Sequence, residues 1–389
     1  MMVCNSIALK LARIGRETPD PPGGVIVRDA SGEPTGILKD AAMDAISEVR
    51  PARTADELAE ALRAAMALAA SVGVTSVQDL PGTPGDFDAW ARLRDRGELT
   101  VRVAYRPLLT EWEKAADRWR DVKNDEWLRV AGVKAFMDGS LGSSTALFFE
   151  PYSDDPKNSG VYAAEAIPLS RMEERVAAAD RAGLQVVVHA IGDRANAEIL
   201  DLFERVAKGN GPRDRRFRVE HAQHLRPADI PRFARLGVIA SVQPYHAVDD
   251  GRWAEAGIGR DRCKTTYPFR ALLDSGARLA FGSDWDVAPL SPILGIDAAV
   301  TRRTIDGKNP KGWFPEQRIG VEEALRAYTA DAAYAAFEEA EKGTLATGRL
   351  ADFVVLSRDI LAIDPREIVQ TRVDATVVGG RIVYERKSK

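Results

Sequence analysis

Residues able to bind a metal ion or to transfer a proton lie at the ends of short apolar runs in this sequence. Lys134 lies late in RVAGVKAFMD, His189 near the end of LQVVVHA, His221 near the end of FRVEHA, and Asp284 at the end of RLAFGSD. Imidazole and carboxylate groups suit zinc and similar divalent ions, and an open coordination position would activate water. One histidine at a strand end is more often structural than a ligand. Three of the four histidines in such places favour a metal site.

Further polar residues surround these positions. Gln243 and His246 stand at and just after the end of VIASVQP. We interpret His224, three residues after His221, as a surface residue or as a support for a ligand. Lys134 is cationic and becomes useful to a metal only if CO2 converts it to an anionic carbamate. Three acidic residues either orient ligands or serve as solvent-facing and capping residues: Asp138, Asp193 and Glu220.

The order of the apolar runs indicates how these residues are positioned. Seven β-rich runs alternate with helical stretches such as 169–183 and 195–209: Val74–Leu80, Val101–Tyr105, Arg129–Asp138, Leu184–Ala190, Phe217–Ala222, Val238–Pro244 and Arg278–Asp284. This alternation predicts a parallel sheet covered on both faces. Over about 250 residues it has the size and rhythm of a (β/α)8 barrel, whose active site lies at the C-terminal ends of the strands. One of the eight strands is unaccounted for. An open doubly wound sheet is the alternative, although it lacks a convincing GxGxxG turn.

The two ends of the chain differ from this central region. Residues 1–50 are rich in Pro and Gly, as in PDPPGG and SGEPTG, and we expect an irregular segment there. Thr54, with Glu57 three residues on, is a plausible N-cap for a following helix. Gly379 and Gly380 between two β-rich runs predict a hairpin that belongs to a larger sheet. We therefore expect a barrel at 51–338 and part of a sheet at 339–389.

Composition and charge exclude several classes of protein. The 389 residues are 45% hydrophobic and 29% charged, which is typical of a globular chain and not of a disordered or collagen-like one. Lys and Arg number 54 against 58 Asp and Glu, so no nucleic-acid partner is expected. No window has the length of a membrane span, and the N-terminus does not read as a signal peptide. Cys4 and Cys263 do not have the spacing of a metal-binding or redox motif. Because few cysteines are typical of a reducing compartment, we expect a cytoplasmic location and no membrane partner.

Several long motifs resemble the metal-dependent amidohydrolase superfamily, and within it the amidohydrolase-3 branch of N-substituted formamide deformylase-like enzymes. They are GVKAFMDGSLGSSTALFFEPYSD, VVVHAIGDRANAEIL, FRVEHAQHL, IASVQPYH and FGSDWDVAPLSPILGIDAAVTRR. The tail GTLATGRLADFVVLSRD…TVVGGRIVYE resembles the closing β-sandwich segment of the same branch. The resemblance covers the chain from the PDPPGG region to Tyr384. It implies a TIM-like (β/α)8 amidohydrolase barrel with a partial C-terminal β-sandwich segment.

The resemblance also implies a set of roles. The site would hold one or two divalent metal ions, usually zinc. A carbamylated Lys134 would bridge them where two are bound. His189 and His221 would bind the second ion, and Asp284 would bind the first ion and act as general acid and base. His246 would contact the substrate or the developing oxyanion. Attack of metal-bound hydroxide on a carbonyl carbon would then hydrolyse carbon–nitrogen bonds other than peptide bonds, such as amides or N-substituted formamides. We expect a small-molecule substrate, and a homodimer is compatible with the resemblance.

The sequence departs from the superfamily pattern at one important place. The superfamily's first strand ends in a His-x-His pair that binds the first metal, and no His-x-His occurs in these residues. We therefore expect a barrel that lacks its first strand, in an N-terminally truncated member of the superfamily. Two alternatives follow from this: a catalytically impaired remnant of such an enzyme, or a related barrel metallohydrolase that acts on another ester or amide class.

Overall fold

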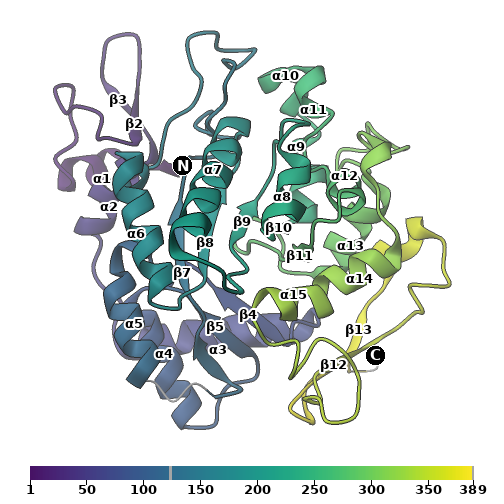
Figure 1. The fold of residues 1–389 in the computed structure, drawn as a ribbon. Coiled ribbons are helices and arrows are strands. Elements are labelled where there is room, and N and C mark those ends of the chain that lie inside the picture. The colour runs from purple at the N-terminus through teal and green to yellow at the C-terminus, as the bar shows by residue number, and fades with distance from the viewer. Residues whose placement is uncertain (122–124, 388–389) are drawn as a thin grey trace.

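The computed structural model describes residues 1–121 and 125–387 and has an α/β architecture built on parallel strands (Figure 1). One parallel sheet has the order β4-β5-β6, formed by β4 (Ser76–Asp79), β5 (Arg102–Tyr105) and β6 (Leu128–Val130). The other has the order β11-β10-β9-β8-β7, formed by β7 (Val133–Phe136), β8 (Val186–Ala190), β9 (Arg218–His221), β10 (Ile239–Val242) and β11 (Leu279–Phe281). All seven predicted runs contain a strand. The third is divided into β6 and β7 near Gly132, whose φ of 139° favours glycine.

The two parallel sheets follow one another without a long gap in the chain. β6 and β7 are separated only by Ala131 and Gly132, and a parallel bridge between Leu108 and Lys134 joins the segment after β5 to β7. The strands therefore form a continuous series from β4 to β11. Within the described residues, no strand pairs with the outer edge of β4 or of β11.

Burial accounts for the apolar character of these strands. Every residue of β5, β8, β9, β10 and β11 is buried, whereas all four residues of β4 are partly exposed. Consecutive residues of a strand point to opposite faces, so the five fully buried strands are covered on both faces and read as nearly continuous apolar runs. Phe203 of α7, for example, stacks on Phe217 beside β9 with ring centroids 4.3 Å apart.

The helices of the central region lie around the strands (Figure 1). Thr54 is the N-cap of α3 (Ala55–Ser71), and the predicted capping box with Glu57 is present. The others are α4 (Pro84–Asp95), α5 (Trp112–Asp121), α6 (Leu169–Arg181), α7 (Asp193–Asn210), α8 (Ile230–Leu236), α9 (Pro244–Asp250), α10 (Ala254–Ile258), α11 (Arg260–Cys263), α12 (Phe269–Asp274), α13 (Pro292–Thr301), α14 (Val321–Tyr328) and α15 (Ala330–Ala335). Among the described residues, no helix combines the length and the apolar character needed to cross a bilayer.

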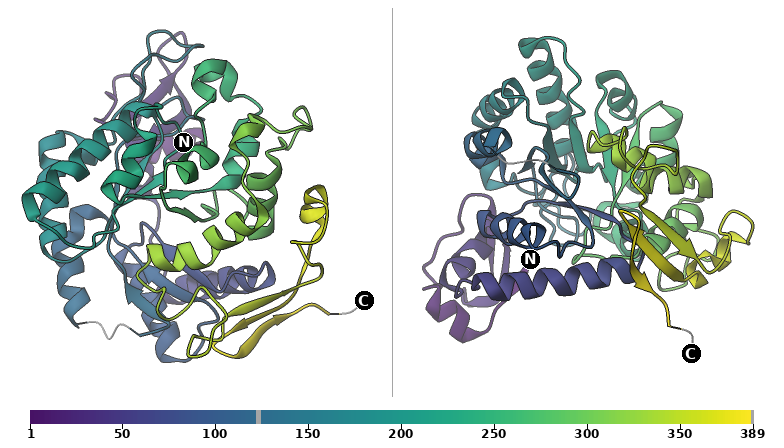
Figure 2. Two further views of the ribbon diagram at one scale, coloured as in Figure 1. Left: turned by 45° about the vertical axis from the view of Figure 1, so that its right-hand side comes forward. Right: turned by 90° about the horizontal axis from the view of Figure 1, so that it is seen from below.

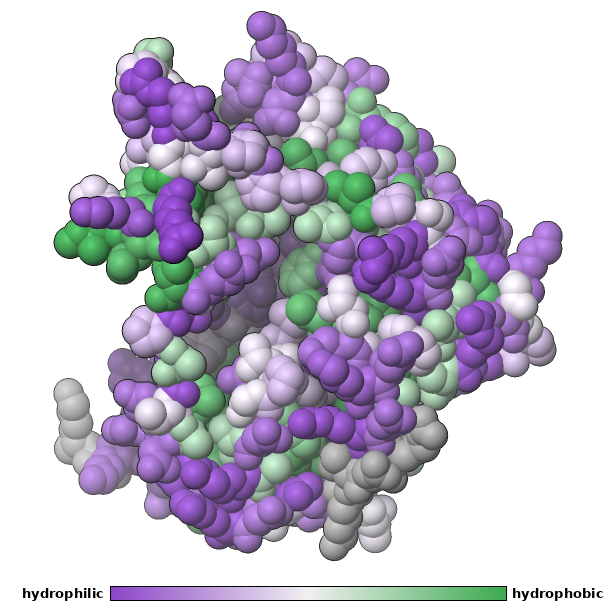
Figure 3. Space-filling model, turned by 90° about the vertical axis from the view of Figure 1, so that its left-hand side faces the viewer, coloured by the Kyte–Doolittle hydropathy of each residue, from purple (hydrophilic) through white to green (hydrophobic). Residues whose placement is uncertain are grey.

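The N-terminal segment is more regular than expected. It contains α1 (Ser6–Leu11), α2 (Asp44–Val49) and a small antiparallel sheet of order β1-β3-β2, formed by β1 (Met2–Val3), β2 (Gly24–Arg28) and β3 (Pro34–Asp40). The expectation of an irregular segment was wrong because its Pro- and Gly-rich stretches are the turns around short strands. Lys39 Nζ donates to the Ser143 carbonyl at 2.5 Å and ties this sheet to the loop after β7. Met1, Val3, Ile7 and Leu11, near the start of the segment, are exposed. Figure 3 shows hydrophobic patches and a deep hollow on this side of the molecule.

The C-terminal region forms a three-stranded antiparallel sheet of order β12-β13-β14, with β12 (Phe353–Leu356), β13 (Val373–Val378) and β14 (Arg381–Glu385). The predicted hairpin is confirmed: Gly379 and Gly380 connect β13 to β14 with φ values of 56° and 74°. The sheet lies beside α3, as both views in Figure 2 show. Thr376 Oγ1 donates to the Ala70 carbonyl at 2.6 Å and fixes this contact.

Candidate metal centre

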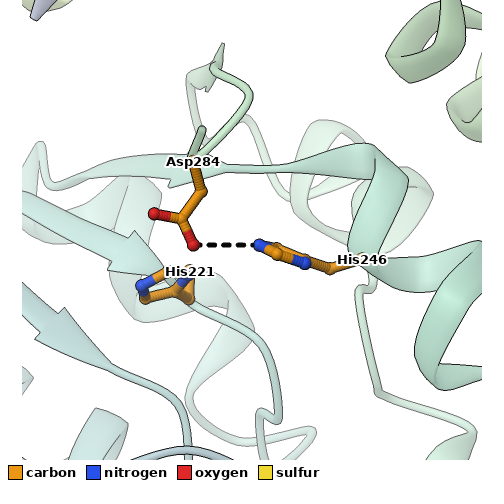
Figure 4. A group of neighbouring side chains, drawn as sticks. All are labelled: His221, His246 and Asp284. Carbon is orange, nitrogen blue, oxygen red and sulfur yellow. Dashed lines mark hydrogen bonds and ion pairs between the residues drawn. The ribbon is translucent and has the colours of Figure 1, made fainter. Parts of the chain in front are cut away.

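Three of the predicted residues, from three different elements, meet at the C-terminal ends of the strands. His221 is the last residue of β9, His246 lies in the first turn of α9 after β10, and Asp284 follows β11. One ligand atom from each of the three lies within 4.8 Å of the others. Figure 4 shows the side chains pointing toward one another. His221 and Asp284 have φ values of 74° and 57°, a conformation that turns the chain sharply away from its strand.

His246 and Asp284 are directly bonded. His246 Nε2 donates to Asp284 Oδ2 at 3.1 Å. Burial opposes protonation of the imidazole, but the hydrogen bond and the negative charge of Asp284 outweigh it and raise the pKa of His246 above its ordinary value. The carboxylate of Asp284 thus favours the protonated form of His246.

His221 has the properties of a metal ligand. Its Nδ1 is buried and has no hydrogen-bond partner. Burial, followed by the neighbouring His189 and Lys134, lowers the pKa of His221 well below the usual value, so the ring is neutral and keeps a lone pair. Two imidazoles and a carboxylate at this spacing, one with an orphaned nitrogen, fit a divalent ion of the zinc type.

His189 and Lys134, also predicted as ligands, lie beside this cluster. The rings of His189 and His221 are 4.5 Å apart between centroids and meet edge to face. His189 Nε2 donates to the Gly139 carbonyl at 2.9 Å, so its Nδ1 keeps the lone pair. Burial and the charge of Lys134 lower the pKa of His189 to about 3. Lys134 is buried, its Nζ lies 4.8 Å from the centroid of the Phe136 ring, and burial lowers its pKa to about 8.

Asp138, for which the sequence left two interpretations open, lies directly behind His189. Its Oδ1 is 3.5 Å from His189 Nε2. Its two oxygens accept the backbone N–H groups of Leu147, Ile191 and Gly192 at 2.8–3.0 Å. Burial raises the pKa of Asp138 to about 7, although these bonds act in the opposite direction. Asp138 therefore fixes the loops that follow β7 and β8 around His189.

A second group of hydrogen-bonded residues, behind His246, was missed by the sequence analysis. Asp250 lies one turn after His246 on α9, and its Oδ2 accepts from Tyr267 Oη at 2.5 Å and from Gln223 Nε2 at 2.9 Å. Gln223 Nε2 also donates to His224 Nε2 at 3.0 Å. The four-residue spacing of His246 and Asp250 on a helix is the one signal that could have indicated this arrangement.

The interpretation of His224 as a surface residue was wrong. The residue is 2% exposed, because the loop after β9 folds inward and pairs with residues 265–267. Its Nδ1 donates to Thr266 Oγ1 at 2.8 Å, while its Nε2 accepts from Gln223. This arrangement suits the neutral ring, and burial lowers the pKa of His224 to about 3.

Comparisons with known proteins show the family of the chain. Residues 1–384 match the Amidohydrolase family. The chain is 43% identical to Protein LONG AFTER FAR-RED 3 of Arabidopsis thaliana over 99% of its own length and 67% of that protein. It is 28% identical to N-substituted formamide deformylase of Arthrobacter pascens, with 98% and 71% covered.

A solved structure with the same fold is an uncharacterized metal-dependent hydrolase from Pyrococcus horikoshii. It superimposes with a TM-score of 0.77 at 30% identity, over 94% of this chain and 71% of that one. The chain belongs to the amidohydrolase family and has the fold of its metal-dependent hydrolases.

Proposed function

We propose that this protein hydrolyses carbon–nitrogen bonds other than peptide bonds, in amides or N-substituted formamides, with the help of a divalent metal. The observation that carries the proposal is the cluster of His221, His246 and Asp284, with ligand atoms within 4.8 Å of one another. The similarity to N-substituted formamide deformylase over 98% of the chain supports the substrate class.

The metal, for which we propose zinc, would be held by His221, His246 and Asp284. When bound, it supplies Lewis-acid polarisation of a carbonyl and lowers the pKa of water. We infer that His246 is a ligand rather than a substrate contact, since it is part of the compact cluster. His189 Nδ1 and a carbamate on Lys134 would provide a place for a second ion. The low pKa of Lys134 supports this, because the neutral amine is the form that adds to CO2 with loss of a proton.

Asp284 would move the protons of the reaction. Its side chain is about one-third exposed, so it faces the solution from which water and substrate arrive. Its carboxylate would accept a proton from the attacking water and transfer it to the leaving nitrogen. The 3.1 Å contact between His246 Nε2 and Oδ2 brings these two side chains to the point where both could bind one ion, and Asp138 Oδ1 lies 3.5 Å from His189 Nε2.

The arrangement of strands supports a finer proposal about the fold. The series from β4 to β11, joined through the Leu108–Lys134 bridge, corresponds to seven strands of a distorted TIM-like barrel. The unpaired edges of β4 and β11 face the position that an eighth strand occupies in such a barrel. The C-terminal sheet would be part of a β-sandwich.

A panel of substrates tests the proposed function. We expect zinc-dependent release of amine from N-substituted formamides or simple amides and no release of phosphate from phosphoesters. Turnover of phosphoesters alone would contradict the proposal. A second candidate, a metal-binding chain without turnover, is favoured by the absence of His-x-His from the sequence. Tight zinc binding with no activity on any amide would support this candidate instead.

A further inference from the structure

Gln223, Asp250 and Tyr267 form a closed network of hydrogen bonds behind His246, which we call the Asp250 network. Asp250 Oδ2 accepts from Tyr267 Oη at 2.5 Å and from Gln223 Nε2 at 2.9 Å. The backbone N–H of Tyr267 donates to the Gln223 carbonyl at 2.7 Å and closes the network. The three residues come from three separate segments: the loop after β9, the end of α9 and the segment before α12.

The Asp250 network joins the two segments that carry the clustered histidines. Gln223 lies two residues after His221, which ends β9, and Asp250 lies one turn after His246 on the seven-residue helix α9. Backbone bonds between residues four apart hold each turn of an α-helix, so Asp250 and His246 move together. The bond from Gln223 to Asp250 therefore fixes the backbone of His246 relative to that of His221.

The partners of Asp250 are themselves held firmly. Gln223 is 3% and Tyr267 1% exposed. Arg302, which is also 1% exposed, donates through Nη1 to the Tyr267 carbonyl at 3.0 Å. Gln223 Nε2 also donates to His224, but without that bond Gln223 keeps its contact with Asp250 and its backbone bond to Tyr267. The network thus gives α9 a rigid anchor.

The acceptor role of Asp250 can be separated from its charge. Burial raises the pKa of Asp250 to about 6, whereas the Tyr267 bond and the charge of His246 favour the carboxylate. Both hydrogen bonds of the network end on the same oxygen, Oδ2. An asparagine at this position can present its one carbonyl oxygen to the same two donors, while an alanine presents none.

We propose that Asp250 is a positioning residue of the metal centre, which holds α9 against the end of β9 so that His246 and His221 face the same ion. The inference rests on the metal centre proposed above and adds the residue that sets the spacing of two of its ligands. Residues that orient metal ligands contribute strongly to metal affinity, although they do not touch the ion.

Zinc affinity of the full chain, measured by competition with a chelator, tests this role. Asp250→Ala should bind zinc about tenfold or more weakly than wild type, and Asp250→Asn should remain within about threefold of wild type. Equal affinity in Asp250→Ala and wild type would overturn the inference. An equal loss in the Ala and Asn variants would also overturn it, because charge and not position would then be responsible. Failure of wild type to bind zinc would instead contradict the metal centre itself, and this inference with it.

Asp180→Ala is the matched control for the loss of a buried carboxylate. Asp180 is 1% exposed and accepts from Arg215 and Asn210. Arg215 precedes β9, so this group lies at the opposite end of the strand from His221. The control should have a lower Tm than wild type and an unchanged zinc affinity. A loss of zinc affinity as large as that of Asp250→Ala would show a general effect of destabilisation and contradict the positioning role.

Tyr267→Phe keeps the inference testable if Asp250→Ala does not fold. This variant removes one hydroxyl group from the network and should bind zinc about fivefold more weakly than wild type. Where both variants fold, the double variant should bind no more weakly than Asp250→Ala, since the same bond cannot be lost twice. Unchanged affinity in Tyr267→Phe, or additive losses in the double variant, would contradict a role of the network in holding His246.

Discussion

His246 Nε2 donates to Asp284 Oδ2 at 3.1 Å, although the two residues lie 38 positions apart and on different elements. The bond joins the first turn of α9 to the segment after β11, above the end of β9 where His221 lies. It places the proposed proton acceptor next to an imidazole whose protonated form the carboxylate favours.

Replacement of Asp284 by Asn is expected to reduce hydrolysis of the best amide or formamide substrate by about 100-fold or more, since an amide cannot accept the proton from water. The fold should be retained, because the side chain is partly exposed. Steady-state kinetics and circular dichroism check both parts. Asp286→Asn, two residues away and exposed, is the control and should keep full activity. Equal rates in the two variants would remove Asp284 from this role.

The buried His224 predicts a specific dependence of stability on pH. Its folded-state pKa of about 3 lies below that of the unfolded chain, about 6.5. Its contribution is therefore fully present above pH 6.5 and is lost as the pH falls below it. As the pH falls from 6.5 to 5, wild type should lose stability relative to His224→Gln, at a rate that approaches about 1.4 kcal/mol per pH unit. Urea unfolding at a series of pH values measures this difference, and parallel curves for the two proteins would contradict it.

Asp138→Asn is expected to lower the free energy of unfolding by about 2 kcal/mol or more. The two carboxylate oxygens of Asp138 together accept three backbone N–H groups. Asn replaces one of these oxygens by an NH2 group, which cannot accept, so at least one backbone N–H loses its partner. Urea unfolding at pH 8 provides the measurement. Asp261→Asn, at an exposed residue of α11, should change the stability by less than about 0.5 kcal/mol. A similar small effect at Asp138 would show that the loops around His189 do not depend on it.

Lys134→Gln is expected to reduce the number of zinc ions bound per chain, because the proposed carbamate would be lost. Bicarbonate should increase zinc binding by wild type and have no effect on the variant. Lys342→Gln is a matched control, since Lys342 is also buried but is paired with Glu338 at 2.9 Å. Equal zinc content in wild type and Lys134→Gln would make Lys134 a structural residue.

The strands could be predicted because burial on both faces leaves a direct trace in the sequence. β8 to β11 are short apolar runs between amphipathic helices. His221 and Asp284 could be predicted as site residues because each lies at the end of such a run. β1 to β3 show no such pattern, because most residues of this small sheet are only partly buried and its strands are separated by Pro- and Gly-rich turns.

The finer features of the candidate site depend on contacts between distant loops. The Gly139 carbonyl that accepts from His189 belongs to the loop after β7. Thr266, which accepts from His224, lies 42 residues from it in the chain. No local pattern indicates such pairs, so the predicted roles of His189 and His224 could not include their partners.

Zinc affinity measured by competition with a chromophoric chelator tests the central claim most directly. We expect wild type to bind at least one ion tightly, and His221→Ala and Asp284→Asn to bind at least about 100-fold more weakly, since each removes one of three ligands. His224→Ala should bind like wild type, because His224 is buried nearby but bonded to Thr266 and Gln223. Equal affinity in all four proteins would contradict a metal centre at His221, His246 and Asp284.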